Sequence, residues 1–233
     1  MAFADEDWNV LSRFHEAKYS PAVIYDIGAS DGSWTRRIRP LFDTARFELF
    51  EPLAERNAAY DAGIALTKRL PNCTFHPIAL GDAAGEANLA FLNDTGVGSS
   101  LLGVSPEGSN ILKVQVKTLD DMIESGEIPP AQVIKMDTQG SELNILLGAQ
   151  NRALPHAELV LIESWLVRGY GPSTPLLSEV MAFMDSHGFL PFELADEYRN
   201  DAGLLVSKDV WYVRRNSLAA QIVWGALSPA QLP

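Results

Sequence analysis

The sequence contains very little cysteine and few cationic side chains. Cys73 is the only cysteine among 233 residues, which excludes an internal disulfide and any CxxC metal or redox site. The sequence has 18 lysines and arginines and 30 aspartates and glutamates, which gives a formal net charge of −12. A field of this sign repels phosphate backbones and anionic lipids. We therefore expect no nucleic-acid partner, and a reducing, cytoplasmic location.

Long apolar runs and internal repeats are also absent. No stretch approaches the roughly 18 apolar residues of a membrane-spanning helix, and acids at positions 5–7 stand where a secretory signal places positive charge, so no membrane span is expected. With 47% hydrophobic residues, the length fits one α/β domain over residues 21–215. Residues 1–20 are predicted to form a helical extension. Residues 216–233 are predicted to form a tail, for which three alternatives stay open: packing on the domain, joining a dimer, or fraying. The sequence does not decide the oligomeric state.

Short apolar runs that end in an acid or a turn recur along the chain. Four of them cover residues 23–26, 47–51, 133–137 and 159–163. Runs of this kind are typical of parallel strands buried on both faces. Because helical patterns lie between them, they predict βαβ units and a Rossmann-like, doubly wound, mostly parallel α/β sheet.

Further strands are predicted around this parallel core. Residues 73–80 are expected to form one strand, and 88–92 an antiparallel addition at a sheet edge. Residues 189–194 and 204–213 are predicted to close the domain as a hairpin, which supplies a terminal antiparallel strand. The Gly- and Ser-rich stretch 93–110 is a loop, either a lid that shapes acceptor choice or a plain surface loop.

A glycine-bearing turn follows the first predicted strand. Residues 26–32 read Asp-Ile-Gly-Ala-Ser-Asp-Gly, and a helix pattern follows. Such a turn lets a ligand approach backbone N–H groups at a helix N-terminus. A dinucleotide fingerprint needs glycines at 28, 30 and 33, whereas the chain has Ser30 and Ser33. The looser G-x-x-x-G spacing favours an amino-acid or nucleoside group over a pyrophosphate.

An acid ends the second predicted strand. Glu51 follows Gly32 by 19 residues, near the distance at which an acid binds a ribose diol in this type of fold. A carboxylate accepts both ribose hydroxyls, and both nicotinamide and methyl-donor cofactors carry that diol. The missing glycines favour the methyl donor. So does Asp26, because a carboxylate attracts a sulfonium and repels a pyrophosphate.

Taken together, these segments resemble the FkbM-type methyltransferases, from about residue 22 to residue 214. The most specific segment is K-x-D-x-x-G-x-E at Lys135–Glu142. The other matching segments are 25–32, 50–52, 79–82, 99–101 and 118–120. The resemblance implies the methyltransferase fold and an enzyme that uses S-adenosylmethionine. Such enzymes usually methylate a hydroxyl of a sugar, glycolipid or secondary metabolite, so a small-molecule or glycan acceptor is expected.

The resemblance also implies roles for individual residues. Asp137 and Glu142 would lie beside the transferred methyl group. Ser99 and Ser100 in the loop, with Glu163 and Trp165 after the fourth strand, are candidates for acceptor contacts, and ordinary loop residues are the alternative. The cofactor-binding set would be Asp26, Gly28, Ala29, Gly32, Glu51, Pro52, Ala79 and Asp137.

The acids have a chemical rationale that is independent of the resemblance. The carboxyl ends of parallel strands meet at one edge of a sheet, so Asp137 and Glu163 should share a cleft. An alcohol is a poor nucleophile until a base removes its proton, and a crowded carboxylate can act as that base. Asp137 is the first candidate for general base, with Glu142 as its partner. The alternative is that Asp137 caps the next helix while Glu142 complements its dipole.

Three other possibilities remain at the level of sequence. Asp137, Glu142 and Glu163 together offer enough oxygens for a divalent metal ion such as magnesium. A nicotinamide-dependent oxidoreductase would share the turn and Glu51, although its fingerprint would also require glycines at positions 30 and 33. A methyltransferase fold that binds its ligand without catalysis would share every motif.

Overall fold

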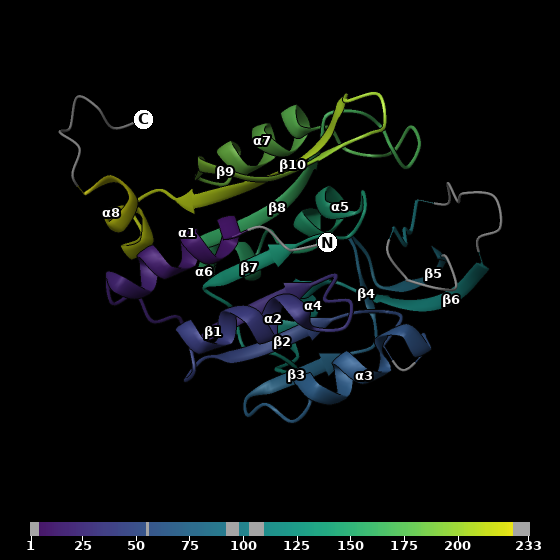
Figure 1. Ribbon diagram of the computed structural model, residues 1–233, viewed down its shortest axis with the longest axis horizontal. Helices are drawn as coiled ribbons and strands as arrows, with labels where there is room; N and C mark the ends of the chain where they lie inside the picture. The colour runs from purple at the N-terminus through teal and green to yellow at the C-terminus, as the bar shows by residue number, and fades with distance from the viewer. Residues whose placement is uncertain (1–4, 55, 92–97, 103–109, 226–233) are drawn as a thin grey trace.

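The computed structural model describes residues 5–54, 56–91, 98–102 and 110–225 (Figure 1). Its main sheet has seven strands in the order β3-β2-β1-β7-β8-β10-β9. Only β10 runs against the others in this sheet. This confirms the mostly parallel sheet with an antiparallel closing strand. The strands are β1 (Val23–Ile27), β2 (Arg46–Phe50), β3 (Cys73–His76), β7 (Val133–Met136), β8 (Leu159–Trp165), β9 (Phe189–Arg199) and β10 (Leu205–Arg214).

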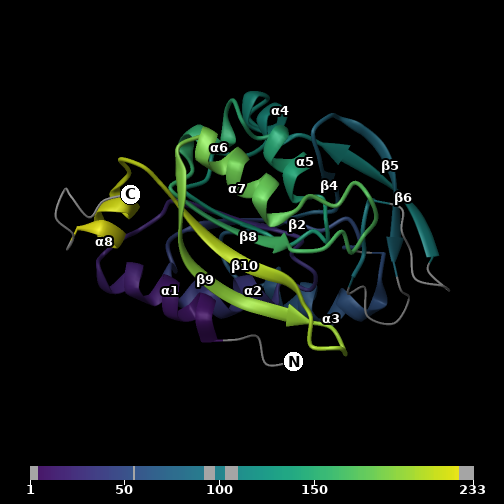
Figure 2. The same cartoon turned by 90° about the horizontal axis from the view of Figure 1, so that it is seen from above.

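Helices cover both faces of the sheet, as a doubly wound fold requires (Figure 2). One face carries α1 (Asp5–Glu16), α2 (Ser33–Ile38), the 3₁₀ turn η1 (Arg39–Leu41), α3 (Ala58–Thr67) and α8 (Leu218–Trp224). The other carries α4 (Leu119–Glu124), α5 (Glu142–Leu147), α6 (Ala153–His156) and α7 (Leu177–Ser186). Successive side chains of β1 therefore enter different cores: Ile24 packs on the first face and Tyr25 on the second. This explains why the strand sequences are apolar without alternation.

The prediction of one strand over residues 73–80 is wrong. The chain turns at Pro77, where Ile78 donates its N–H to the carbonyl of His76 at 2.9 Å. Proline has no N–H for a strand ladder, so the sheet pairing stops there. β3 stays in the main sheet, whereas β4 (Ala79–Leu80) joins β6 (Asn110–Lys117) and β5 (Gly85–Phe91) in a separate three-stranded sheet.

Residues 88–92, expected at an edge of the main sheet, belong instead to this second sheet as far as the structure describes them. Of the loop 93–110, residues 98–102 and 110 are described, and the rest lies outside the described residues. Of the tail 216–233, Leu218–Trp224 form α8, and Ala219 and Ala220 pack into the first core.

A buried carboxylate helps to hold the N-terminal helix on the sheet. Asp7 accepts hydrogen bonds from the indole N–H groups of Trp34 in α2, at 3.1 Å, and of Trp211 in β10, at 3.0 Å. Leu11 and Phe14 bury the apolar stripe of α1 on the same face. Burial raises the pKa of Asp7 above its ordinary value. α1 therefore packs as part of the helical layer.

Gly28 lets the turn after β1 touch the end of β7. Its φ is +71°, and a Cβ atom at this position would lie 1.8 Å from the backbone oxygen of Asp137. The N–H groups of Gly28 and Ala29 both donate to the carbonyl of Phe50 in β2, at 3.0 and 3.1 Å. The turn is thereby fixed between its two neighbouring strands, and only glycine fits there.

Gly28→Ala is expected to destabilise the protein much more than Gly126→Ala. Gly126 also has a positive φ, of +75°, but a Cβ atom there would meet nothing within 4 Å. The control change should therefore cost only the left-handed backbone penalty of about 1–2 kcal/mol. Gly28→Ala adds a clash with main-chain atoms that should cost about 1–3 kcal/mol more. Equilibrium urea denaturation measures both, and equal losses would contradict this account of the turn.

Candidate functional site

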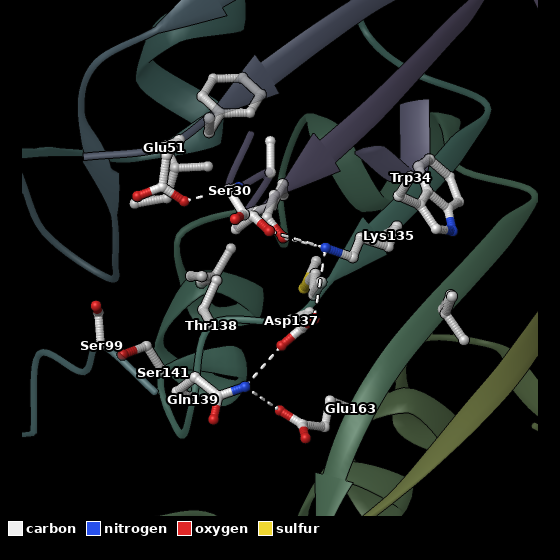
Figure 3. Close-up of a pocket in the computed structure, with 18 of the residues that line it drawn as sticks. Ser30, Trp34, Glu51, Ser99, Lys135, Asp137, Thr138, Gln139, Ser141 and Glu163 are labelled. Atoms are coloured by element: carbon white, nitrogen blue, oxygen red, sulfur yellow. Dashed lines mark hydrogen bonds and ion pairs between the residues drawn. The ribbon is translucent and has the colours of Figure 1, made fainter. Parts of the chain in front are cut away.

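A cavity of about 390 Å³ lies at the carboxyl ends of β1 and β7. This is where the strand order reverses direction, because the chain moves outward from β1 to β3 and then returns to β7. Ligands of open α/β sheets bind at such switch points. Figure 3 shows the side chains that surround it, which come from the β1 turn, the end of β2, the segment after β7 and the end of β8.

Most of the residues predicted from the sequence line this cavity. They are Gly28, Ala29, Glu51, Pro52, Ala79, Ser99, Asp137 and Glu163. Asp26, Gly32, Ser100, Glu142 and Trp165 do not line it, although each lies next to a residue or segment that does.

Asp26 and Gly32 support the floor of the cavity from behind. Asp26 is fully buried; it accepts a hydrogen bond from Thr35 Oγ1 at 2.7 Å and forms an ion pair with Lys135 Nζ at 3.3 Å. Gly32 is the N-cap of α2 with φ +81°, packed against Thr67. Both residues hold the glycine turn in place without reaching the cavity.

Glu142 faces the backbone of its own loop. Its carboxylate accepts hydrogen bonds from the N–H of Thr138 at 2.9 Å and of Gly140 at 3.0 Å, and from Thr138 Oγ1 at 3.0 Å. The side chain is completely buried, and this burial raises its pKa to about 7. The geometry therefore gives Glu142 no direct path to a ligand in the cavity and makes it the brace of residues 138–140.

Ser100 and Trp165 also act behind the cavity wall. Ser100 Oγ donates to the carbonyl of Gln139 at 2.8 Å. Trp165 is buried, and its ring meets that of Tyr170 edge to face, with centroids 5.0 Å apart. Ser100 therefore fixes Gln139, which lines the cavity, and Trp165 packs on Tyr170, whose hydroxyl is bonded to Gln139.

Glu51 ends β2 with its carboxylate at the cavity. It accepts the N–H of Ser30 at 2.9 Å and that of Leu53 at 2.9 Å. Glu51 is only 7% exposed. Burial raises the pKa of its carboxyl group to about 7, although the two hydrogen bonds act in the opposite direction. Since a carboxylate has about four lone-pair sites, it can still accept two hydroxyl groups.

Lys135 joins the two central strands. Its ammonium lies 3.3 Å from Asp26 Oδ1 and 3.7 Å from Asp137 Oδ2, and it donates to the carbonyl of Gly28 at 2.9 Å. Burial disfavours its charge, but the two carboxylates outweigh burial and raise its pKa above the ordinary value. Lys135 is therefore a fixed positive charge beside Asp137.

Gln139 bridges the two acids at the ends of β7 and β8, and sequence reasoning missed it. Its amide Nε2 donates to Asp137 Oδ1 and to Glu163 Oε2, each at 2.8 Å, and its Oε1 accepts from the hydroxyl of Tyr170. Its φ is +56°, which is uncommon for a residue other than glycine. Burial, followed by the charge of Asp137, raises the pKa of Glu163 well above its ordinary value.

The three acids considered for a metal ion do not converge. Both oxygens of Glu142 are bonded to backbone N–H groups, and the Gln139 amide stands between Asp137 and Glu163. Within the described part of the chain, no group of three or more His, Cys, Asp or Glu side chains is arranged to hold a metal ion. The set does not fit a divalent metal.

Four further acids at the cavity were not identified from the sequence. They are Asp7 of α1, Asp196 and Glu197 of β9, and Asp209 of β10. A signal existed for two of them. Asp7 stands four residues before Leu11 on the apolar stripe of its helix, and Asp209 stands two before Trp211, on the inward-facing side of its strand. An acid on a buried face is informative because it needs a partner or a function.

No helix among the described residues is long and apolar enough to cross a bilayer.

The sheet order, the glycine turn and the acids at the switch point define a Rossmann-like fold of the methyltransferase type. A family model for the methyltransferase FkbM domain matches residues 26–191, and the chain belongs to this family. The resemblance seen in the sequence is thus confirmed.

Individual relatives agree with this assignment. The chain is 30% identical over 161 residues to the hexuronic acid methyltransferase AglP of Haloferax volcanii, which covers 67% of this chain and 62% of the relative. Among solved structures, an FkbM methyltransferase from Methylobacillus flagellatus matches with a TM-score of 0.51 at 17% identity, over 81% of this chain and 43% of the other. An O-methyltransferase from Klebsiella pneumoniae, described as putative, matches with a TM-score of 0.51 at 11% identity, over 92% and 83%. The structural matches show the fold alone.

Glu163→Gln is expected to change how stability depends on pH. The folded protein holds a proton on Glu163 more tightly than the unfolded chain does, because its pKa is raised. The stability that this proton contributes is present below the ordinary carboxyl pKa and is lost as pH rises through the folded value. Above the ordinary carboxyl pKa of about 4.3, the variant should therefore lose less stability with rising pH than the wild type does.

Urea denaturation at several pH values measures this difference. Glu86→Gln is the control, because Glu86 is exposed on β5, in the second sheet. If Glu163→Gln and the wild type lose stability in parallel over this pH range, Glu163 does not hold its proton in the folded state.

Proposed function

We propose that the protein is an S-adenosylmethionine-dependent methyltransferase that methylates a hydroxyl oxygen of a sugar or a similar polyol. The observation that carries the proposal is that one cavity joins the glycine turn, Glu51 and the pair of Asp137 and Glu163. Family membership supports the reaction class. The hexuronic acid methyltransferase among the relatives supports a sugar acceptor.

The part of the cavity near Glu51 fits the nucleoside of the cofactor. Glu51 would receive the ribose diol through its remaining lone pairs. Pro52, Ile78 and Ala79 line the same part with apolar surface that suits an adenine ring. When bound, S-adenosylmethionine supplies a methyl group on a positively charged sulfur, and the acidic lining of the cavity attracts that charge. Asp26 and Gly32 contribute by fixing the turn.

The pair of Asp137 and Glu163 is where the chain would handle the acceptor. The Gln139 amide now donates to both carboxylates, so a hydroxyl in its place could donate to Asp137. Asp137 then accepts the hydroxyl proton as the oxygen becomes a nucleophile. Lys135 places its positive charge 3.7 Å from Asp137 Oδ2. Glu142 acts as a positioning residue through Thr138 and Gly140.

A buried serine supports a polar occupant in the same region. Ser141 is 2% exposed and lines the cavity, and its Oγ has no hydrogen-bond partner among the described residues. A buried hydroxyl without a partner costs free energy unless a ligand or a water satisfies it. An acceptor with several hydroxyl groups would do so.

Calorimetric titration should show that S-adenosylmethionine binds and NADH does not. Affinity should increase as pH rises through about 7, because ionised Glu51 accepts both ribose hydroxyls better than the protonated acid does. Glu51→Gln should weaken binding by roughly ten- to a hundredfold and abolish this pH dependence. Glu16→Gln, an exposed change in α1, should match the wild type. Binding of NADH alone would favour an oxidoreductase instead.

Asp137→Asn should reduce methyl transfer by about a hundredfold or more, because it removes the general base. Its affinity for S-adenosylmethionine should stay close to that of the wild type, since Glu51 and the glycine turn are intact. Single-turnover assays with calorimetry separate the two effects, and Asp82→Asn in an exposed turn is the control. A fully active Asp137→Asn would remove this residue from the chemistry. Cofactor binding by the wild type without any turnover would indicate a binding protein.

A further inference from the structure

A row of side chains crosses the last three strands of the main sheet beside Glu163. Glu163 accepts a hydrogen bond from Ser207 Oγ at 3.0 Å. In the antiparallel ladders, Ser207 of β10 lies opposite Trp165 of β8 on one side and opposite Tyr198 of β9 on the other. Side chains that oppose one another in this way lie on the same face of a sheet, with Cβ atoms about 5 Å apart. One small side chain, that of Ser207, therefore separates Tyr198 from Glu163.

Tyr198 brings an exposed aromatic ring to the cavity. It is 53% exposed, and of the large hydrophobic residues that the described part of the chain exposes, Tyr198 alone lines the cavity. No aromatic ring of a described residue stacks on it, and no described cation lies over its face. Exposed apolar surface at a cavity is typical of a ligand-binding site. The Tyr198 ring is therefore accessible to a ligand that has reached Glu163.

An aromatic ring close to hydrogen-bond acceptors suits a sugar ring. A pyranose has hydroxyl groups at its edge and C–H groups on its faces. The C–H face packs against an aromatic face through dispersion and the burial of apolar area, while carboxylate oxygens accept the hydroxyl hydrogens. An open-chain polyol offers no such face, and it loses the freedom of several rotatable bonds when it binds.

We propose that Tyr198 is a specificity-determining residue that stacks on the acceptor, and that the acceptor is a closed sugar ring and not an open-chain polyol. This inference rests on the proposed function and narrows its substrate class. The hydroxyl to be methylated lies at Asp137, a second hydroxyl donates to Glu163, and the C–H face lies against Tyr198. The carboxyl group of Glu163 accepts a hydrogen bond whether or not it carries a proton, so the arrangement does not depend on its charge.

Three matched pairs of probes test the class of acceptor: methyl glucoside with glucitol, methyl mannoside with mannitol, and methyl glucuronide with gulonate. The two members of each pair share the configuration of their carbon chain and differ in ring closure. Ligand-observed NMR with protein saturated by S-adenosylhomocysteine measures their affinities. At least one glycoside should bind about tenfold or more tightly than its open-chain partner.

Three variants test the role of Tyr198. Tyr198→Ala should weaken binding of the best-bound glycoside by about three- to tenfold, whereas Tyr198→Phe keeps the ring and should match the wild type. In methyl-transfer assays Tyr198→Ala should raise KM more than it lowers kcat, because the ring does not touch the reacting atoms. Leu194→Ala is the matched control, since Leu194 is 60% exposed on the same strand and does not line the cavity.

Affinity for S-adenosylmethionine, measured by calorimetry, should stay close to wild type in all three variants. Open-chain probes that bind as tightly as the glycosides, or a failure to bind any glycoside, overturn the inference. So does a Tyr198→Ala variant that binds like the wild type, or a Tyr198→Phe variant that loses as much affinity as Tyr198→Ala. If glycosides are methylated equally well by wild type and Tyr198→Ala, the proposed function stands without the inference. If the wild type does not bind S-adenosylmethionine, the proposed function fails first.

Discussion

The buried ammonium of Lys135 is the interaction on which the rest of the site depends. It ties the carbonyl of Gly28 to the carboxylates of Asp26 and Asp137, so the turn after β1 and the end of β7 have one fixed separation. Removing one partner from a buried charge pair costs about 3–5 kcal/mol, and here it would leave two carboxylates to repel each other. The proposed cofactor side and the proposed acceptor side meet at this residue.

Much of the fold could be predicted because strand and turn signals are local. The apolar runs at 23–26 and 133–137 are continuous because both faces of each strand are buried. The spacing from Gly32 to Glu51 is typical of a strand, a helix and the next strand in one βαβ unit. The failure at 73–80 was also local: Cys73 and Phe75 alternate with polar residues before Pro77, the apolar residues 78–80 follow it, and the pattern alone did not register the missing N–H.

The candidate site was less predictable, because side-chain direction depends on backbone geometry that no pattern encodes. Glu142 turns toward its own loop because Gln139 and Gly140 adopt positive φ values, which bring backbone N–H groups around its carboxylate. Asp7 and Asp209 approach one cavity from opposite ends of the chain. Contacts of that range leave only an indirect trace in the sequence, namely an acid on an otherwise apolar face.

The hydrogen bonds of Asp7 also determine the stage of protein synthesis at which the cavity can be complete. Asp7 and Trp211 are 204 residues apart, yet the Trp211 indole donates a hydrogen bond to Asp7, which lines the cavity. The ribosome must therefore deliver nearly the whole chain before the cavity wall at this contact can close, whereas β1, β2 and the turn between them are available early. An incomplete chain would therefore present the turn after β1 and Glu51 without the wall that α1 and β10 form together, so the last strands to be synthesised complete the cavity.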